Sequence, residues 1–534
     1  MFPATRSFMR ALAVAALFST LSGSTVAAPA PPAPAHTATK ATSAVKATPA
    51  QPAGPLKLTI LHTNDMHGHL TPETDKSIVP PPEKVGGAAY LATLIKQYRA
   101  ANPDHTLLLD DGDIAQGTPV SNLFWGRPMA QFMNAVKYDA GTVGNHEFDW
   151  GAPPFRAMVN LRTFPVVCAN IIDVRTGKLP FGLKRFIIKD LDGVKIGITG
   201  VITSTTPSMS FKQNVASFRF DNEVEVLKTV IPEMRKAGAQ VIVVLSHNGD
   251  KDDSHIAEQV PGIAVIVGGH SHTAMNDPIF VNGTVIVQAG KYMRYLGKLD
   301  VTLDRKTFKV ISYTKKGELV PVITAKIKPD PAIEKMVTAY MDKIGPAMEA
   351  VVGQCETDLP RTPASGQCDS ALGDVVTDAL RDKVSADVAV YNAGGIRTDF
   401  NKGPLKMSDI FTLLPFDNYV VSVMMSGEQL QRLFAQGLSD AHGTVQISGA
   451  SFKVGADGKP ADIKIGGHPI DPKKMYKVAT VDFLAEGNDG LLVFKEVRDR
   501  TIDALARDVF LAYVRKNSPL KAPTTGRITR TSAP

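Results

Sequence analysis

The first indication of the fold is a stretch in which an apolar run passes directly into a polar cluster. This stretch is residues 56–68, Leu-Lys-Leu-Thr-Ile-Leu-His-Thr-Asn-Asp-Met-His-Gly. The run Lys57–His62 predicts a strand, and its nearly continuous apolar character suits burial on both faces. Residues two apart in an extended chain point the same way, so Asp65 and His67 are expected to converge. The stretch therefore predicts a buried strand that ends in a pair of candidate ligands.

The same alternation continues downstream. Further strands are expected at Thr106–Leu109, Val166–Ala169, Lys195–Val201, Val241–Ser246, Ile263–Val267 and Thr284–Gln288. Between them, Ala88–Tyr98 and Val224–Ala237 have the apolar spacing of amphipathic helices. Short apolar strands that alternate with helices indicate a layered α/β domain.

Four more polar clusters follow predicted strands or a short apolar run: Asp111–Asp113, Gly144–Asp149, Ser246–Gly249 and Gly268–His272. Side chains at successive strand ends of such a sheet meet in one crevice. The collected donors are two carboxylates, one amide and four imidazoles: Asp65, Asp113, Asn145, His67, His247, His270 and His272. Oxygen and nitrogen donors without thiolate favour Zn, Mn or Fe. Seven donors suit two divalent ions that share a carboxylate better than one tetrahedral ion.

Each cluster by itself has an ordinary structural explanation. An Asp-x-His pair more often forms loop hydrogen bonds than a metal site, and a Gly-Asp pair is usually a turn. The prediction depends on five such clusters in one domain. The histidines outside the clusters, such as His62 and His69, lack this context and are expected to be structural.

A second domain is expected after the helical spacing of Pro331–Glu349. Helices are expected near Ser370–Lys383, Ser408–Leu414 and Glu428–Gln436, with strands around Val388–Tyr391, Val420–Met425 and Tyr476–Val481. We therefore predict an α/β protein with a first domain at 56–328, an interdomain helix or hinge at 329–352 and a C-terminal domain at 353–530.

The N-terminus has the features of a Sec-type signal peptide over residues 1–28. Arg6 and Arg10 precede the apolar stretch Ala11–Leu21, and cleavage is expected near Ala27 or Ala28. The alternative is an uncleaved anchor. Residues 29–55 are rich in Ala and Pro and are expected to be a disordered linker. A periplasmic or secreted protein without a stable membrane anchor is predicted.

Charge and cysteine content limit the partners and the compartment. The formal charge of +7 falls to 55 basic against 52 acidic residues once residues 1–55 are set aside. With no basic block, a nucleic-acid polymer is not an expected partner. Cys355 and Cys368 suit either a disulfide after export or two unpaired thiols, and Cys168 is expected to be a buried free thiol.

The order Asp-x-His, Gly-Asp, Gly-Asn-His-Glu, His, Gly-His-x-His resembles the calcineurin-like metallophosphoesterases. The fuller forms TNDMHGH (63–69) and GNHEFDWG (144–151) resemble the 5′-nucleotidase family, of the bacterial periplasmic 5′-nucleotidase/UDP-sugar hydrolase type. The resemblance covers residues 56–530. It implies an N-terminal four-layer αββα sandwich, an interdomain helix and a C-terminal α/β substrate-binding domain.

The resemblance also implies roles for the candidate ligands. One metal would take Asp65, His67, Asp113 and His272, and the other would take Asp113, Asn145, His247 and His270. His272 stands where the periplasmic branch often has Gln. His146 would be catalytic, and Asp149 would fix its tautomer. Metal hydroxide would attack phosphorus in line, without a phosphoenzyme.

Residues of the C-terminal domain are implied to bind the substrate. Asn392–Arg397 resembles the motif Asn-Gly-Gly-Gly-Ile-Arg, with Ala393 replacing a glycine. The other positions implied to bind are Phe416 and Phe483 for the nucleobase, Asn418 for a base contact, Asp489 for the ribose, and Arg361. Arg361 is the only arginine in 361–368, where the family has further arginines. Without the resemblance, the two phenylalanines would be expected in the core.

The expected activity is release of phosphate from nucleoside 5′-monophosphates, with UDP-sugars and nucleoside di- and triphosphates as further candidate substrates. One alternative on the same scaffold is a 2′,3′-cyclic-nucleotide phosphodiesterase/3′-nucleotidase or a thiosulfohydrolase. Another is a catalytically inactive nucleotide-binding or adhesion protein, against which the complete ligand set argues. A monomer or weak homo-oligomer is expected.

Overall fold

The computed structural model describes residues 54–438, 443–497, 499–524 and 526–530. The predicted signal peptide and nearly all of the predicted linker lie outside the described residues. Within the described part of the chain, none of the helices is long and apolar enough to cross a membrane.

The first sheet of the N-terminal half is built around a parallel core. Its strands run in the order β13-β12-β1-β2-β3, and β14 also pairs with β12. Their bounds are β1 Leu56–Thr63, β2 Thr106–Asp110, β3 Ala140–Gly141, β12 Tyr295–Leu303, β13 Val310–Tyr313 and β14 Leu319–Pro321. Because β1, β2 and β3 are parallel, their carboxyl ends lie at one edge of the sheet.

The second sheet faces the first across an apolar core to which both contribute, for example Ile60, Leu109 and Val243. Its order is β10-β11-β9-β8-β6-β5. The bounds are β5 Phe186–Leu191, β6 Val194–Ile202, β8 Val241–His247, β9 Val265–Gly268, β10 Ile279–Val281 and β11 Thr284–Gln288. Every residue of β8 and β9 is buried, as the continuous apolar runs predicted.

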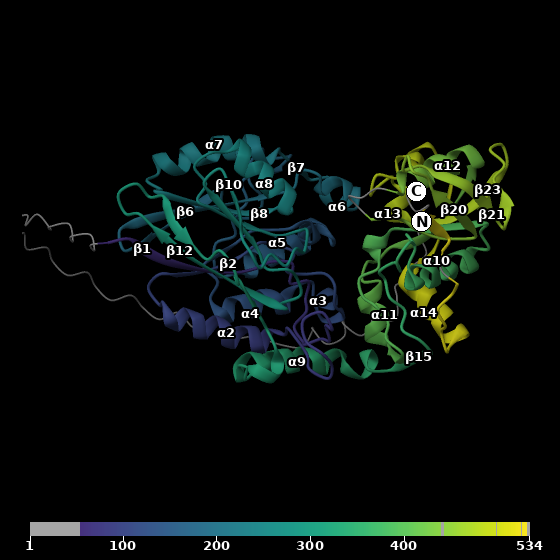
Figure 1. Ribbon diagram of the computed structural model, residues 1–534, viewed down its shortest axis with the longest axis horizontal. Coiled ribbons are helices and arrows are strands. Elements are labelled where there is room, and N and C mark those ends of the chain that lie inside the picture. Colours follow the sequence, from purple (N-terminus) through teal and green to yellow (C-terminus); the bar gives the residue numbers. More distant parts are fainter. Residues whose placement is uncertain (1–53, 439–442, 498, 525, 531–534) are drawn as a thin grey trace, which may run out of the picture. The chain divides into compact units, whose positions relative to one another are not determined.

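Helices cover both outer faces and complete an αββα arrangement. Figure 1 shows α2 and α4 on one side of the paired sheets and α7 and α8 on the other. The helices are α2 Ala88–Ala101, α3 Pro119–Leu123, α4 Arg127–Val136, α5 Ala152–Leu161, α6 Lys212–Val215, α7 Glu223–Lys236 and α8 Asp250–Gln259. A small antiparallel pair, β4 (Ile171–Asp173) with β7 (Phe218–Phe220), lies outside the two sheets.

One strand prediction is wrong. Residues Val166–Ala169 form only isolated bridges, because their hydrogen bonds are divided between the two sheets. The Val167 amide donates to Gly141 O of the first sheet at 2.8 Å, and the Ala169 amide donates to Gly200 O of the second sheet at 2.8 Å. A segment that bonds alternately to two sheets cannot form a continuous ladder with either.

The helix expected at Pro331–Glu349 is present as α9, Pro331–Met348. Asp330 caps its N-terminus by accepting hydrogen bonds from the amides of Ala332 and Ile333, and Pro331 occupies the first helical turn. The helix packs against α2 and also reaches α11 of the C-terminal half.

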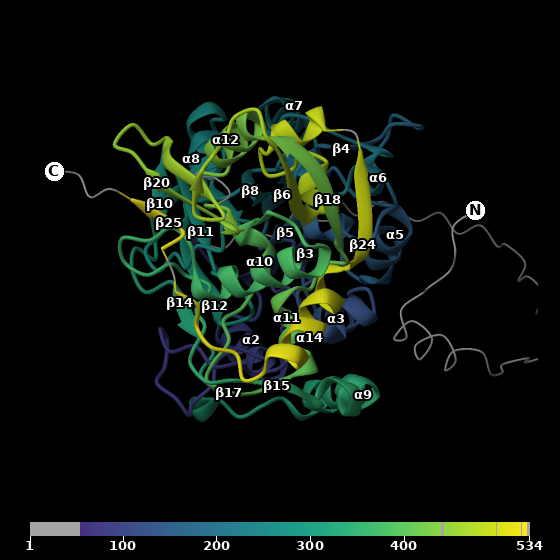
Figure 2. The same cartoon turned by 90° about the vertical axis from the view of Figure 1, so that its right-hand side faces the viewer.

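The C-terminal half has one apolar core and two larger sheets, in the orders β19-β16-β23-β18-β24 and β22-β21-β20-β25, with β15 paired to β17. Figure 2 shows β18 and β24 side by side. The strands are β15 Val351–Cys355, β16 Val388–Tyr391, β17 Gly403–Lys406, β18 Tyr419–Ser426, β19 Gln446–Ser448, β20 Ala450–Val454, β21 Pro460–Ile465, β22 His468–Pro469, β23 Met475–Val481, β24 Arg500–Leu505 and β25 Ile528–Arg530. The helices are α10 Ala371–Val384, α11 Met407–Leu413, α12 Gly427–Gln436, α13 Asp482–Ala485 and α14 Ala506–Asn517.

All three cysteines are buried free thiols. Of the two alternatives for Cys355 and Cys368, the structure therefore has the unpaired one. Cys168 is buried as predicted, and burial raises the pKa of its thiol to about 12.

Candidate active site

The seven candidate ligands come together at the carboxyl ends of the parallel strands. Asp65 and His67 follow β1, Asp113 follows β2, and Asn145 opens a 3₁₀ segment just after β3. His247 is the last residue of β8, while His270 and His272 follow β9. Both sheets thus contribute to one crevice, as expected for strand ends of a layered α/β domain.

Six of these residues form two compact groups, each able to hold a metal ion. Asp65, His67 and His272 form one group, and Asp113, His247 and His270 form the other. Within each group, one nitrogen or oxygen atom from every residue lies within 4.8 Å of the others.

Asp113 connects the two groups. Its Oδ2 lies 3.2 Å from His247 Nε2 in its own group and 3.7 Å from His67 Nε2 in the other. A carboxylate between two ligand groups is the arrangement in which a pair of ions shares one ligand.

Several buried ligand atoms in the crevice form no hydrogen bond within the described part of the chain. Asp65 Oδ1, Asn145 Oδ1 and His247 Nε2 are buried without a hydrogen bond. A buried polar atom without a partner is costly, so three of them facing one crevice fit cation ligation.

The opposite ring nitrogens of two histidines are already engaged. His67 Nδ1 donates to Gln116 O at 2.9 Å, and His247 Nδ1 donates to Asp111 O at 2.6 Å. These bonds leave each Nε2 unprotonated and turned into the crevice. His67 Nε2 and His272 Nε2 lie only 3.2 Å apart, so both nitrogens can face the same cation. The residues present therefore fit two divalent ions.

The backbone is unusual at most of these positions. Five of the seven candidates have positive φ: Asp65 at 48°, His67 at 46°, Asp113 at 48°, His270 at 71° and His272 at 58°. This left-handed region is uncommon for residues other than glycine, and such conformations cluster at functional sites. The conformations turn side chains from adjacent loops toward a common point.

Residues that the sequence did not single out hold these loops. Asn64 donates to Asp65 Oδ2 at 2.6 Å and to Gly290 O at 2.7 Å. Glu147, which is fully buried, accepts from the amides of Asp113 at 3.1 Å and Gly144 at 2.6 Å. The sequence could not predict either role, because both depend on contacts between loops that are distant along the chain.

Glycines are required where two of these loops touch. A Cβ on Gly144 would lie 2.2 Å from Asp113 Oδ1, and a Cβ on Gly112 would lie 2.4 Å from the Gly144 nitrogen. Two loops can approach this closely only without side chains.

His146 and Asp149 form the pair expected from the sequence. His146 Nδ1 lies 2.8 Å from Asp149 Oδ2, and the His146 ring centroid lies 5.2 Å from that of His67. Burial opposes the charged imidazolium, but the nearby carboxylates of Asp149 and Asp113 outweigh it and raise the pKa of His146. This raised pKa favours a protonated ring beside the two ligand groups.

The predicted substrate residues border the same crevice to different extents. Phe416 lies 5.7 Å from the His146 ring, and the Arg397 guanidinium lies 5.9 Å from the Phe416 ring. Asn392 Nδ2 donates to Asp489 Oδ2 at 2.7 Å.

The remaining substrate candidates have other neighbours. The ring centroid of Phe483 lies 6.0 Å from that of Phe211 in the N-terminal half. Asn418 is buried. Arg361 donates to Ile396 O at 2.8 Å, within the segment that carries Arg397. Segments from both halves therefore surround the crevice.

Four residues beside the crevice were missed by sequence reasoning. Tyr292 lies 5.7 Å from the His67 ring and 5.9 Å from the His272 ring, and His69 stacks on Tyr292 at 3.8 Å. Lys291 and Arg294 both lie over the Tyr292 ring, at 4.9 and 5.1 Å. Lys291, Tyr292 and Arg294 belong to a Lys-Tyr-Met-Arg run after β11, which contains no recognisable motif.

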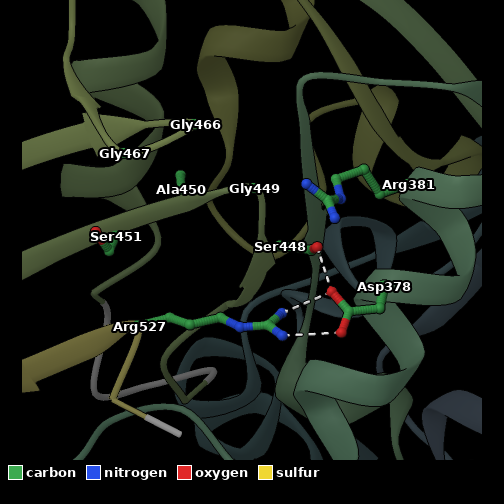
Figure 3. A pocket seen from close by; sticks show the side chains of 9 residues that line it. All are labelled: Asp378, Arg381, Ser448, Gly449, Ala450, Ser451, Gly466, Gly467 and Arg527. Carbon is green, nitrogen blue, oxygen red and sulfur yellow. Dashed lines mark hydrogen bonds and ion pairs between the residues drawn. The ribbon is translucent and has the colours of Figure 1, made fainter. Parts of the chain in front are cut away.

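A second polar hollow of about 320 Å³ lies entirely in the C-terminal half (Figure 3). There Arg527 binds Asp378 at 2.8 Å and Ser448 donates to the same carboxylate, which ties the residue before β25 and the end of β19 to α10. None of the candidate site residues lines this hollow.

Comparison with known proteins agrees with the fold and the crevice. Residues 58–274 match the calcineurin-like phosphoesterase family, and residues 351–496 match the 5′-nucleotidase C-terminal domain. The chain is 30% identical over 543 residues to the 5′-nucleotidase of Bos taurus, covering 89% of this chain and 91% of that protein.

A solved structure extends this similarity to the whole fold. The 5′-nucleotidase precursor of Thermus thermophilus superposes with a TM-score of 0.83 at 28% identity, covering 90% of this chain and all of that one. Another relative, Endonuclease YhcR of Bacillus subtilis, is 29% identical over 456 residues, and the chain spans only 37% of its length.

Fold and site together define a two-domain α/β metallophosphoesterase with two His/Asp groups suited to metal. The chain belongs to the 5′-nucleotidase family, and it is a hydrolase of the 5′-nucleotidase type.

Proposed function

We propose that this protein is an exported dinuclear-metal phosphohydrolase that releases phosphate from nucleoside 5′-monophosphates. The observation that supports this most strongly is the pair of ligand groups connected by Asp113, with His146 and Phe416 at its border. The phosphate of a nucleotide would lie at the two ligand groups, and its base would lie at Phe416.

The proposed ligands follow the two groups. Asp65, His67, Asp113 and His272 would hold one ion, and Asp113, Asn145, His247 and His270 the other. When bound, the ions supply Lewis-acid activation of water and neutralise charge on the phosphoryl oxygens. Zn²⁺ and Mn²⁺ both suit this set of oxygen and nitrogen donors.

His146 would act on the substrate directly. Its Nδ1 is held by Asp149, so Nε2 is the nitrogen free to face the reacting phosphate. A protonated Nε2 can stabilise charge on the phosphoryl group or protonate the leaving 5′-oxygen. Asp149 orients the ring and sustains its charge.

The C-terminal half would provide specificity. Phe416 and Phe483 are proposed to stack on the base, Asp489 and Asn392 to bind the ribose, Asn418 to contact the base, and Arg397 with Arg361 to bind phosphate. Stacking tolerates any base because every base has a π-face. UDP-sugars and nucleoside di- and triphosphates offer the same groups and are further candidate substrates.

Phosphate release decides between this proposal and its alternatives. Purified protein with and without chelator, and after Mn²⁺ or Zn²⁺ add-back, would be assayed on AMP, UDP-glucose, 2′,3′-cyclic AMP and a thiosulfonate. Metal-dependent release from AMP at the highest kcat/KM supports the proposal. Preference for the cyclic nucleotide or the thiosulfonate would point to the alternative activity, and no turnover would point to a binding protein.

We further propose 56–328 as the catalytic domain, 353–530 as the substrate-binding domain and 329–352 as a hinge between them. Lys76 belongs to the proposed catalytic domain and Asp358 to the proposed substrate-binding domain. Lys76 Nζ lies 3.9 Å from Asp358 Oδ2, and both side chains are exposed. A Lys76→Cys/Asp358→Cys variant joined by a reducible bis-maleimide linker should slow turnover until the linker is cleaved, because lid and domain motions often limit release. Full activity of the cross-linked protein would refute the hinge.

A further inference from the structure

Three cations beside the crevice have no carboxylate partner in the described part of the chain: Lys291, Arg361 and Arg397. The guanidinium groups of Arg361 and Arg397 donate only to backbone carbonyls, those of Ile396 at 2.8 Å and Gly394 at 3.2 Å, and the nearby Asp399 carboxylate accepts from the Arg361 backbone amide. The Arg397 Nε is buried without any hydrogen bond. No ion pair within the described residues involves Lys291, which is half buried.

Arg294, a neighbour of Lys291, differs from it because carboxylates neutralise its charge. It lies over the same Tyr292 ring as Lys291, but it binds Glu73 at 2.5 Å and Asp75 at 2.5 Å. Both carboxylates pair directly with Arg294, and although the charge of Glu73 also acts on Lys291, no carboxylate of the described residues forms an ion pair with Lys291.

The three unpaired cations act on one another and on the ligand groups. Burial, reinforced by repulsion from Arg361 and Arg397, lowers the pKa of Lys291 to about 8. Like charges that are partly desolvated and lack a counter-ion are unfavourable unless an anion binds among them. Burial is the main reason that the pKa values of His67 and His272 are lowered, and the positive charge of Arg397 adds to it at both rings, as that of Lys291 does at His272.

The segment that carries Lys291 is fixed to the metal loop. The Tyr292 amide donates to Asp65 O at 2.9 Å, and Asn64 binds both Gly290 and the amide of Ala289. Tyr292 and Met293 are both held at positive φ, 61° and 58°. Such a conformation is maintained only where surrounding contacts impose it, so Lys291 is held in place beside the ligand groups.

We infer that Lys291, from the catalytic half, is a substrate-binding residue that contacts the phosphate held at the two ligand groups, together with Arg361 and Arg397. Lys291 adds a positive charge to this phosphate site, to which the stretch 361–368 contributes a single arginine. The inference rests on the proposed function for the identity of the phosphate compound, but not for the binding of phosphate itself.

The test compares phosphate binding and turnover in Lys291 variants of the full, Mn²⁺-loaded chain. Inorganic phosphate is the binding probe, measured by titration calorimetry, and AMP is the substrate. Lys291→Met should weaken phosphate binding and raise KM for AMP by roughly tenfold each, the usual size of one charge-assisted contact, with a smaller change in kcat. Lys291→Arg should retain most of both affinities, and Lys291→Gln provides a second neutral variant.

Lys298→Met is the matched control. Lys298 also lies over a tyrosine, Tyr98 at 5.7 Å, but it is paired with Asp300, so its removal should change neither phosphate affinity nor KM. Equal metal content in all variants would exclude an indirect effect on the ions. Phosphate affinity within twofold of wild type in both neutral variants would overturn the inference. Failure of wild type to hydrolyse AMP, with phosphate binding still lost in the variants, would overturn the proposed function alone.

Discussion

The two halves of the molecule contribute to the crevice in different ways. Asp65, His67 and His247 of the N-terminal half are fully buried, and each side chain is held by a hydrogen bond from or to a neighbouring residue. Arg361, Arg397 and Phe416 of the C-terminal half are only half buried, and the two guanidinium groups donate only to backbone carbonyls. The groups proposed for chemistry are therefore preorganised, whereas the groups proposed for recognition still have free bonding capacity for a ligand.

The largest effect is expected from Asp113→Ala, because Asp113 touches both ligand groups. Activity on AMP should fall by at least about 10³-fold, more than removal of a single electrostatic group usually costs. Metal analysis should show fewer than the wild-type number of ions per chain. Asp252→Ala, an exposed carboxylate on α8, is the control and should behave as wild type. Retention of both ions and activity in Asp113→Ala would contradict the connecting role.

His146→Gln should lower kcat by roughly 10²- to 10⁴-fold without loss of metal, as expected for a group that moves a proton or stabilises charge. Asp149→Asn keeps the shape of the pair and should cost about 10- to 100-fold, the range for a residue that orients another. Single-turnover rates together with metal content would measure this. A larger loss in Asp149→Asn than in His146→Gln would reverse the assigned roles.

Gly144→Ala tests preorganisation without touching a ligand. The new methyl group would lie 2.2 Å from Asp113 Oδ1, so the Asp113 loop must move. Metal affinity or activity should fall about 10- to 100-fold, as for other losses of support around a metal site. Gly177→Ala is a comparison with open space around the added methyl group. An unchanged Mn²⁺ affinity in Gly144→Ala would show that the loop tolerates displacement.

The smallest effect is expected in the recognition half. Phe416→Ala should raise KM for AMP by about tenfold, from a stacking contribution of about 1–3 kcal/mol. Base-free ribose 5-phosphate should show no comparable change. An equal loss on both substrates would mean that Phe416 supports His146, which it contacts at 5.7 Å, and does not bind the base.

Sequence reasoning succeeded where a signal is local. Strands such as Val388–Tyr391 and Thr284–Gln288 have the predicted bounds, because length and apolar content are properties of the segment itself. It failed for Val166–Ala169, whose hydrogen bonds are divided between two sheets. The structural role predicted for His69 agrees with its stacking on Tyr292 and with the 3.1 Å between its Nδ1 and Glu73 Oε2.

The sequence by itself determined which donors follow which strands, since a polar cluster after an apolar run is written in consecutive residues. It also determined the family, through the motifs at residues 63–69 and 144–151. The position of Asp113 between the two ligand groups, and that of Lys291 near Arg361 and Arg397 without an ion pair among the described residues, follow from the tertiary structure alone. Those relations depend on strand register and on packing between segments tens to hundreds of residues apart, and no local pattern encodes them.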